Sequence, residues 1–227
     1  MPPLHILFQD AFLVAINKPA GMIVHPGRDK EDPEDIAILR LRDLLGRRVY
    51  PVHRLDRPTS GVQLFALDKQ TASLTQQAFA RREVFKTYHA IISGCTPPQW
   101  TCETPLKTNP EDEPLSAETS FERIAVTSPG DFPNHAELIL SLLKASPLTG
   151  RFHQIRRHLL EAGFPIVGDF RYAGIERSFE LGEILGTGTR MLLQSKNLKL
   201  THPHTNEPLE IIAPTDPEFR KCFPDLS

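Results

Sequence analysis

Residues 53–61 constrain this chain more than any other stretch. They read His-Arg-Leu-Asp-Arg-Pro-Thr-Ser-Gly, so one carboxylate, Asp56, stands between two arginines and is followed by a Pro and a Gly that break regular structure. A run typical of a β-strand follows at residues 62–67. The polar side chains are therefore expected on a loop that enters a strand, where a rigid scaffold often holds catalytic groups. Taken alone, the pattern also fits a loop carboxylate with a local hydrogen bond or a surface ion pair, which is the commoner case.

Further motifs stand before and after this stretch. They read Leu-Val-Ala-Ile-Asn-Lys-Pro-Ala-Gly-Met-Ile-Val-His-Pro at 13–26, Lys-Thr-Tyr-His-Ala at 86–90, Thr-Gly-Arg-Phe-His-Gln-Ile-Arg-Arg-His-Leu at 149–159, Pro-Ile-Val-Gly-Asp at 165–169 and Leu-Thr-His-Pro at 200–203. Together with residues 53–61, their order and spacing resemble the RluA-like group of RNA pseudouridine synthases from about residue 4 to about residue 212. Several motifs in order are far more specific than any single one.

The expected elements indicate an α+β chain. Strands are predicted at 4–8, 12–17, 22–24, 62–67, 84–92, 119–126, 136–143, 190–200 and 209–212, and helices at 33–45, 69–82 and 151–161. Gly46 is expected to end the first helix and Asp68 to cap the second. Residues 95–118 and 170–188 show no period that predicts an element. Strands outnumber helices and do not alternate with them regularly, which is typical of the α+β class. The resemblance implies the pseudouridine synthase catalytic fold, a mixed, mostly antiparallel sheet with flanking helices and loops.

No linker or repeat divides the sequence, so we expect a single catalytic domain over residues 1–227. Members of the family often carry an N-terminal S4-type RNA-binding domain. The motifs begin almost at residue 1, so the resemblance leads us to expect that this module is absent.

Composition narrows the cellular context. Hydrophobic residues at 40% and charged residues at 24% are ordinary for a globular protein, and no signal peptide or membrane-length apolar run is present, so a cytoplasmic location is expected. The three cysteines lack C-x-x-C spacing and the histidine spacings match no common zinc motif, so no metal is expected. The resemblance likewise implies no organic cofactor.

The net charge and the pI do not indicate a nucleic-acid-binding protein. The net charge is −2 and the pI about 6.5, whereas such domains are usually basic. Basic clusters do occur at 47–48, 81–82 and 151–158. RNA binding would therefore depend on these clusters gathering on one face, although each alone is also typical of a solvated surface.

The predicted helix at 151–161 places a charge on its apolar side. At helical periodicity, one stripe is formed by Phe152, Ile155, Leu159 and Leu160. The side chains expected to point away are Gln154, Arg157, His158 and Glu161. Arg156 falls near the middle of the stripe, and a guanidinium aimed at the core needs a carboxylate or a deep cleft. A purely structural buried pair would meet that need as well as a functional one.

The resemblance assigns catalytic roles to three residues. It implies that Asp56 is the catalytic nucleophile or base, that Arg156 pairs with it, and that Tyr88 stacks on the target base. Strand alternation puts Tyr88 and Lys86 on the same face as Ala90 and other apolar residues. A core tyrosine whose hydroxyl finds a backbone partner fits this pattern equally well.

Substrate binding is the role expected of four basic residues, Arg54, Lys86, Arg57 and Arg151. The resemblance implies that Arg54 enters the RNA helix where the uridine is flipped out, and that Lys86 supports the pocket or contacts phosphate. The family usually has His where Gln194 stands, so no specific role is expected for that side chain.

The implied reaction is the isomerisation of a specific uridine to pseudouridine in structured RNA. Within the family the motifs look most like the subgroup that acts on tRNA at uridine 65, with ribosomal RNA or another tRNA position as the alternative. The sequence leaves open whether Asp56 attacks the base, attacks C1′ or removes a ribose proton. Two rivals stay open: a carboxylate-dependent nucleoside hydrolase and a non-catalytic RNA-binding module.

Overall fold

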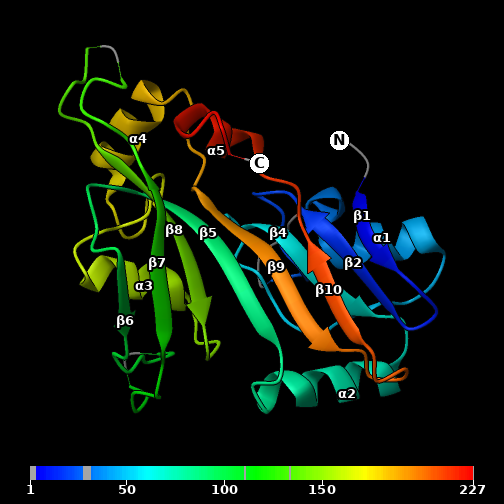
Figure 1. Cartoon of the computed structure of the whole chain (residues 1–227). Helices are drawn as coiled ribbons and strands as arrows, with labels where there is room; N and C mark the ends of the chain where they lie inside the picture. Colours follow the sequence, from blue (N-terminus) through cyan, green and yellow to red (C-terminus); the bar gives the residue numbers. More distant parts are fainter. Residues whose placement is uncertain (1–3, 28–31, 110, 133, 227) are drawn as a thin grey trace. The chain divides into compact units, whose positions relative to one another are not determined.

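The computed structural model describes residues 4–27, 32–109, 111–132 and 134–226 (Figure 1). The chain forms two compact units. Unit 1 consists of Met1–Lys86 and Ser195–Pro214, and unit 2 of Thr87–Gln194 and Thr215–Ser227. Each unit has its own sheet strands and its own hydrophobic clusters. That the two units act as one catalytic domain stays a prediction.

Unit 1 is built on antiparallel strands. β1 (His5–Gln9) pairs with β2 (Leu13–Lys18), which pairs with β4 (Ser60–Ala66), and the two-residue β3 (Tyr50–Pro51) also pairs with β4. β9 (Leu193–Thr201), most of which belongs to this unit, lies next to β4 and pairs with β10 (Pro208–Ile212). The first two predicted strands and the last two are confirmed within a few residues. The central position of β4 puts the loop that precedes it at the middle of the sheet.

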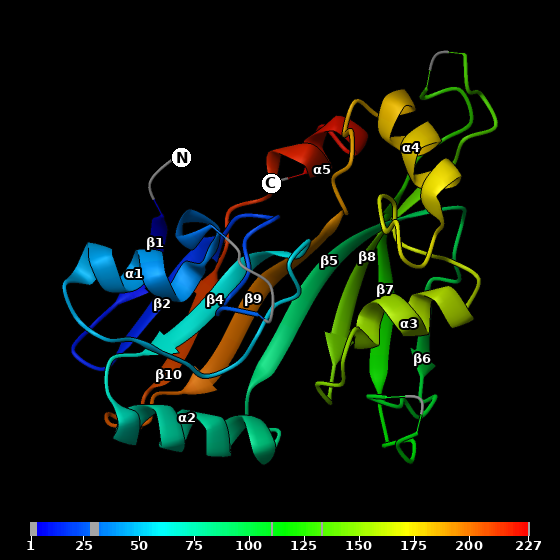
Figure 2. The ribbon, with the colours of Figure 1, turned by 180° about the vertical axis from the view of Figure 1, so that it is seen from behind.

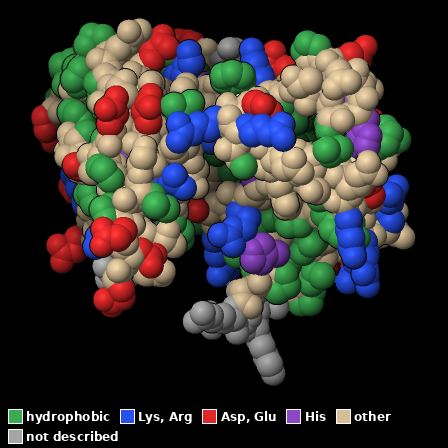
Figure 3. Space-filling view, turned by 90° about the horizontal axis from the view of Figure 1, so that it is seen from below, with side chains coloured by type: hydrophobic (Ala, Val, Ile, Leu, Met, Phe, Trp, Pro, Cys, Tyr) green, Lys and Arg blue, Asp and Glu red, His purple; other side chains and the backbone are tan. Residues whose placement is uncertain are grey.

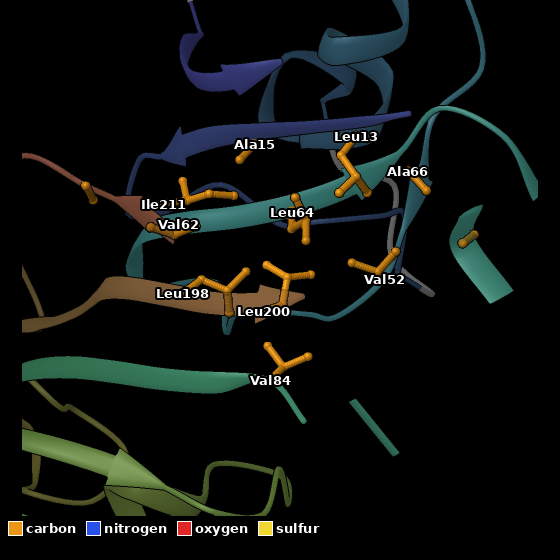
Figure 4. Packing of buried hydrophobic residues seen from close by; sticks show 12 residues of the cluster. Leu13, Ala15, Val52, Val62, Leu64, Ala66, Val84, Leu198, Leu200 and Ile211 are labelled. Atoms are coloured by element: carbon orange, nitrogen blue, oxygen red, sulfur yellow. The ribbon is translucent and has the colours of Figure 1, made fainter. Parts of the chain in front are cut away.

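The unit 1 sheet has a hydrophobic cluster on each face. Strand alternation sends successive side chains of β2 to opposite faces, so β2 contributes to both clusters. Leu13 and Ala15 join one cluster with Val62, Leu64 and residues of β9 and β10, and Figure 4 shows these side chains converging. Val14 and Ile16 join a second cluster on the other face, together with residues of α1 (Ala37–Leu45). A β4 strand with every residue buried is thus held rigidly from both sides.

The helices of unit 1 largely follow their predicted caps. Asp68 begins α2 (Lys69–Ala80) by accepting a hydrogen bond from the Thr71 amide at 2.8 Å, and α1 ends at Gly46 with φ +64°. The continuous helix expected over residues 33–45 is wrong. A short 3₁₀ turn (Pro33–Asp35) is followed by Ile36 in extended conformation, where it makes a parallel bridge to Ile23, and only then does α1 begin.

Unit 2 has a second set of antiparallel strands in the order β5 (Phe85–Ser93), β8 (Leu140–Pro147), β7 (Thr119–Val126) and β6 (Gln99–Cys102). The core on one face includes Ile155 and Leu159 of α3 (Gln154–Glu161), which lies against β7 and β8 (Figure 2). The core on the other face includes residues of α4 (Ile175–Ile184) and α5 (Pro217–Cys222). Unit 2 therefore also has helices against both faces of its strands.

Three elements of unit 2 depart from expectation. The proline-rich segment 95–118 contains the short strand β6, and segment 170–188 contains α4, neither of which was predicted. β8 begins at Leu140 rather than residue 136, because the preceding residues form a turn in which the Leu138 amide bonds the His135 carbonyl. The predicted strand at 119–126 is confirmed as β7, and so is the α+β class. Among the described residues no helix is long and apolar enough to cross a membrane.

Candidate active site

The loop that carries Asp56 runs from β3 to β4 in unit 1. It enters a strand, as the sequence predicts, whereas the short β3 was not predicted. Its backbone is fastened by Gln63, a fully buried residue of β4. The Gln63 side-chain oxygen accepts from the Leu55 amide at 3.1 Å, and its nitrogen donates to the His53 carbonyl at 2.9 Å. These bonds fix the backbone just before Asp56, whose side chain is only partly buried. A strand residue thus sets the position of the loop carboxylate.

A buried lysine fastens the loop on its other side. Lys18 has no exposed surface, and its ammonium donates to the carbonyls of Met22 at 2.6 Å, Pro19 at 3.0 Å and Arg57 at 3.3 Å. The turn after β2 also meets the loop directly, because the Gly21 amide donates to the Arg57 carbonyl at 2.8 Å and Arg57 Nε donates to the Gly21 carbonyl at 2.9 Å. The loop around Asp56 is therefore tied to β2 as well as to β4.

The arginines on either side of Asp56 are both exposed. Arg54 places a guanidinium nitrogen 3.2 Å from Nε2 of His25, while Arg57 turns to the 18–22 turn. Arg54 thus presents a cation at the surface beside Asp56, where the sequence expected an RNA contact. Arg57 has a structural contact that the sequence did not indicate, and its role in substrate binding stays a prediction.

Lys86 and His53 form an electrostatically unusual pair in unit 1. Burial lowers the pKa of Lys86 to about 8. Burial and, second, the charge of Lys86 lower the pKa of His53 to about 3. The neutral His53 ring accepts a hydrogen bond from the Leu64 amide at 3.0 Å and stacks on Phe79 with ring centres 5.1 Å apart. A lysine poised to lose its charge near neutral pH is common at functional sites.

In unit 2, Arg156 is buried in α3 and forms a two-pronged ion pair with Asp169. Its Nε lies 2.7 Å from Oδ2, its terminal nitrogen lies 2.8 Å from Oδ1, and the two side chains are 6% and 1% exposed. The prediction that Arg156 needs a buried acceptor is confirmed. The sequence did not identify Asp169 as that acceptor, although Asp169 closes the motif at 165–169. Asp56 lies in unit 1, and its expected pairing with Arg156 stays a prediction.

Asp169 is itself held by local structure. It follows Gly168, whose φ is +74°, and its Oδ1 accepts from the Tyr172 amide at 3.3 Å. The Tyr172 ring lies 5.0 Å from the guanidinium carbon of Arg156, within cation–π distance. Arg156 is thus oriented by a carboxylate and an aromatic face from one turn. An arginine held this way needs little reorganisation to meet an anion.

The faces of α3 differ from the predicted stripe. Phe152 and Leu160 are 44% and 41% exposed, whereas Gln154 and His158 are buried. The helix begins only at Gln154, after His153 in the left-handed region, so Phe152 lies outside the helix and cannot belong to a helical stripe. Buried polar side chains on α3 are satisfied by hydrogen bonds, such as the one from Gln154 Nε2 to the Glu118 carbonyl at 2.9 Å.

The remaining predicted residues of unit 2 have separate surroundings. Tyr88 of β5 is half-buried and packs on the same cluster as Ala90, which confirms the predicted alternation. Arg151 donates from Nε to the Ser116 carbonyl at 3.0 Å. Gln194 is buried and accepts from the Asp216 amide at 3.3 Å, so it has a structural contact where none was expected. The site candidates thus fall into two groups, with Arg54, Asp56, Arg57 and Lys86 in unit 1 and the others in unit 2.

The surface in Figure 3 carries several separate groups of Lys and Arg side chains, together with Asp and Glu side chains and neutral ones. Both signs of charge on the surface accord with a net charge of only −2. Within the described ranges, no three His, Cys, Asp or Glu side chains are grouped to hold a metal ion.

Comparison with known proteins finds relatives over nearly the whole chain. The family model "RNA pseudouridylate synthase" matches residues 12–161. A protein of Haemophilus influenzae named tRNA pseudouridine synthase C is 37% identical, over 97% of this chain and 96% of its own. A protein of the same name from Vibrio cholerae is 38% identical, over 94% and 91%.

Solved structures give the same fold. Human RNA pseudouridylate synthase domain containing 4 aligns with a TM-score of 0.74 at 26% identity, over 96% of this chain and 90% of that one. Human RNA pseudouridylate synthase domain containing 1 aligns with a TM-score of 0.74 at 23% identity, over 95% and 86%, and supports the fold alone. The chain therefore belongs to the RNA pseudouridylate synthase family, isomerases that convert uridine to pseudouridine in RNA.

Proposed function

We propose that this enzyme acts on tRNA, at the uridine of position 65, with Asp56 as the catalytic nucleophile or base. The observation that carries the proposal is the likeness to proteins named tRNA pseudouridine synthase C, which extends over 97% of the chain at 37% identity. The choice of position 65 rests on the motifs at 53–61, 149–159 and 200–209, which resemble that subgroup. The enzyme would then work in the cytoplasm, where tRNA is found.

The reaction needs a fixed carboxylate. The N1–C1′ bond of the uridine breaks, the base turns and a C5–C1′ bond forms. The hydrogen on C5 leaves as a proton and N1 takes up a proton, so the product is an isomer of the substrate. Asp56 suits the nucleophile or base because Gln63 and Lys18 hold its loop on both sides. No second carboxylate is needed to activate water, in contrast to a glycoside hydrolase.

Arg156 and Tyr88 are proposed to complete the catalytic group. Arg156 would stabilise negative charge on the carboxylate or the departing base, since its guanidinium is kept charged and oriented by Asp169. Tyr88 would stack on the flipped uracil, a role that its half-buried ring permits. Apolar neighbours of Tyr88 such as Ala90 would help keep water from the reacting sugar.

The basic residues are proposed to hold the RNA. Arg54 is exposed beside Asp56 and would fill the space that the flipped base leaves. Arg57 and Arg151 would contact phosphates near the target. Lys86, with its pKa lowered to about 8 by burial, would support the pocket.

The substrate proposal is tested with RNA labelled by tritium at C5 of uridine. Pseudouridine formation releases that tritium, so tRNA carrying uridine 65 should release one tritium per molecule, and chemical mapping should place the product at position 65. A matched tRNA with cytidine at 65 should release none. Modification confined to ribosomal RNA fragments would refute the tRNA assignment. Free uracil among the products would identify the hydrolase alternative instead.

The role of Arg54 is tested by Arg54→Ala, with Arg42→Ala as the matched control, since both arginines are exposed in unit 1 and Arg42 lies outside the basic clusters. Base flipping from a stem costs a few kcal/mol, part of which Arg54 would offset. Single-turnover conversion of tRNA should slow at least tenfold for Arg54→Ala and stay near the parent rate for Arg42→Ala. Equal rates for the two variants would remove Arg54 from the flipping step.

A further inference from the structure

Phe152, just before α3, presents a flat apolar face at the surface of unit 2. Its side chain is 44% exposed. The imidazole of His153 stacks against the ring with centres 3.7 Å apart and planes 21° apart. An exposed phenyl ring that is backed by a second ring is rigid, and it offers its exposed surface for stacking by a third flat group.

The backing ring is fixed by the backbone and by Tyr172. His153 has a φ of +53°, in the left-handed region that side-chain-bearing residues seldom adopt. Its Nδ1 lies 3.0 Å from the Tyr172 hydroxyl, and the two rings meet edge to face with centres 5.7 Å apart. Strained residues of this kind cost energy and persist where surrounding contacts hold them, often at functional places.

A cation completes the surface. Arg171 is exposed, and its guanidinium carbon lies 5.9 Å from the Phe152 ring centre and 5.7 Å from the Tyr172 ring centre. We call Phe152, His153, Arg171 and Tyr172 the aromatic platform. An exposed aromatic ring near the positive charge of an exposed guanidinium matches a nucleotide, whose base stacks and whose phosphate is anionic.

We propose that the aromatic platform binds one unstacked nucleotide of the substrate RNA, with its base on Phe152 and its phosphate near Arg171. The proposal rests on the proposed function only in that the RNA is taken to be tRNA. The Tyr172 ring of the platform also lies 5.0 Å from the guanidinium carbon of Arg156, so a nucleotide held there is close to that catalytic candidate. Stacking supplies affinity that a net charge of −2 does not.

Binding of unmodified tRNA to Phe152 variants tests the stacking. Phe152→Ala should raise the Kd about tenfold, since one base on an aromatic ring contributes that much or more. Phe152→Leu, which keeps apolar bulk without a flat face, should lose nearly as much, and Phe152→Tyr should stay within about twofold of the parent. Phe179→Ala is the matched control, because Phe179 is 51% exposed in α4 and meets Phe170 edge to face. Its Kd should equal that of the parent.

A tryptophan at the same place reports stacking directly. The chain has a single tryptophan, Trp100, so Phe152→Trp adds one defined fluorophore. Its added emission should be quenched as tRNA is titrated in, over the same concentration range as binding. The emission of Phe179→Trp, in the same titration, should not change.

Salt dependence separates the charge from the ring. Arg171→Ala should reduce the slope of log Kd against log salt concentration by about one, whereas Phe152→Ala should leave that slope unchanged. Arg177→Ala is the control, since Arg177 is exposed in the same unit and pairs with Glu180 at 2.8 Å. All variants should melt near the parent temperature, because the altered side chains lie at the surface.

Parent-like affinity for tRNA in both Phe152→Ala and Phe152→Leu, or unquenched tryptophan emission in Phe152→Trp, would overturn the proposed role of the aromatic platform.

Failure of the proposed function would give a different result. If the parent itself neither binds nor modifies tRNA, the tRNA assignment falls, and the same titrations with the RNA that the parent does modify decide the platform. Asp56→Asn in the Phe152→Trp background should abolish conversion yet keep the quenching.

Discussion

Two buried cations belong to the candidate site. Lys18 holds the loop that carries Asp56, and Arg156 is itself a catalytic candidate. Each is almost inaccessible to solvent and keeps strong hydrogen-bond acceptors, carbonyl oxygens for Lys18 and the Asp169 carboxylate for Arg156. A charge removed from water is tolerated only with such partners. Burying these two charges costs desolvation free energy, and their hydrogen-bond partners then hold the loop of Asp56 and the guanidinium of Arg156 in place.

Asp169→Asn should show how much the buried pair matters. The substitution keeps the size of the side chain and leaves the charge of Arg156 without its carboxylate. Loss of one partner of a buried pair costs about 3–5 kcal/mol, so the free energy of unfolding in urea should fall by about that amount. Pseudouridine formation by the folded fraction should slow as well, because Arg156 is no longer oriented.

A double-mutant cycle controls this prediction. Asp169→Asn combined with Arg156→Gln should lose clearly less stability than the two single losses added together, since the double variant buries no unpaired charge. Glu180→Gln removes a partner of exposed Arg177 and should change stability by less than about 1 kcal/mol. Additive losses across the Asp169 and Arg156 pair would mean that the two side chains are not coupled.

His53 should make the protein sensitive to acid. Burial and the charge of Lys86 lower its pKa from 6.5 to about 3 in the folded state. Between pH 6.5 and pH 3, His53 is protonated in the unfolded chain and neutral in the folded chain. The free energy of unfolding therefore falls as the pH is lowered through this window. His53→Gln keeps a possible acceptor for the Leu64 amide and does not titrate. Its free energy of unfolding should therefore fall less steeply from pH 7 to pH 4.5.

The matched variant for that pH series is His5→Gln, because His5 is exposed in β1. It should follow the pH dependence of the parent. If the free energy of unfolding has the same pH dependence in the parent and in His53→Gln, the pKa of His53 does not differ between the folded and the unfolded chain.

Among the elements, β4 requires glycine at its second residue, because the backbone of β9 comes very close. Gly61 has a φ of +104°, and a Cβ at this position would lie 2.1 Å from the Ser195 carbonyl oxygen of β9. Only glycine meets both demands. The last residue of the 53–61 motif is thus needed for strand packing next to the loop that carries Asp56.

Gly61→Ala should lower the melting temperature severely or prevent folding, since both the backbone and β9 must shift. Gly46→Ala is the matched comparison, because Gly46 also has a positive φ, +64°, but nothing lies within 4 Å of its added Cβ. That variant should lose only about 1–2 kcal/mol from conformational strain. Thermal unfolding of both variants measures the difference, and equal losses would rule out the close contact with β9.

Local signals explain which elements the sequence predicted. Asp68 and Gly46 mark helix ends by hydrogen-bonding and conformational rules that act within a few residues, and both ends are confirmed. Ile36 interrupts the expected first helix because it pairs with Ile23, a tertiary contact that no helix propensity encodes. β6 and α4 were missed for a related reason, since short elements among prolines and glycines depend on packing more than on their own pattern.

Across the whole molecule, the motifs predicted the family, the reaction class and the place of Asp56 on a loop entering a strand. They did not predict the contacts that hold the site residues. Gln63 and Lys18 reach the loop from two strands, and Asp169 meets Arg156 from a turn after its helix. Such partners are set by the tertiary fold, and an arginine on an apolar stripe indicates only that some carboxylate must be near.

Asp56 is the residue on which the proposed function depends most, as the carboxylate through which a uridine of tRNA is proposed to be isomerised. The most direct test is pseudouridine mapping at single-nucleotide resolution in unmodified tRNA, after incubation with the parent enzyme or with Asp56→Asn. The parent should convert uridine 65, and Asp56→Asn should bind tRNA with a similar Kd while converting less than about one thousandth as fast. Substantial conversion by purified Asp56→Asn would contradict the account.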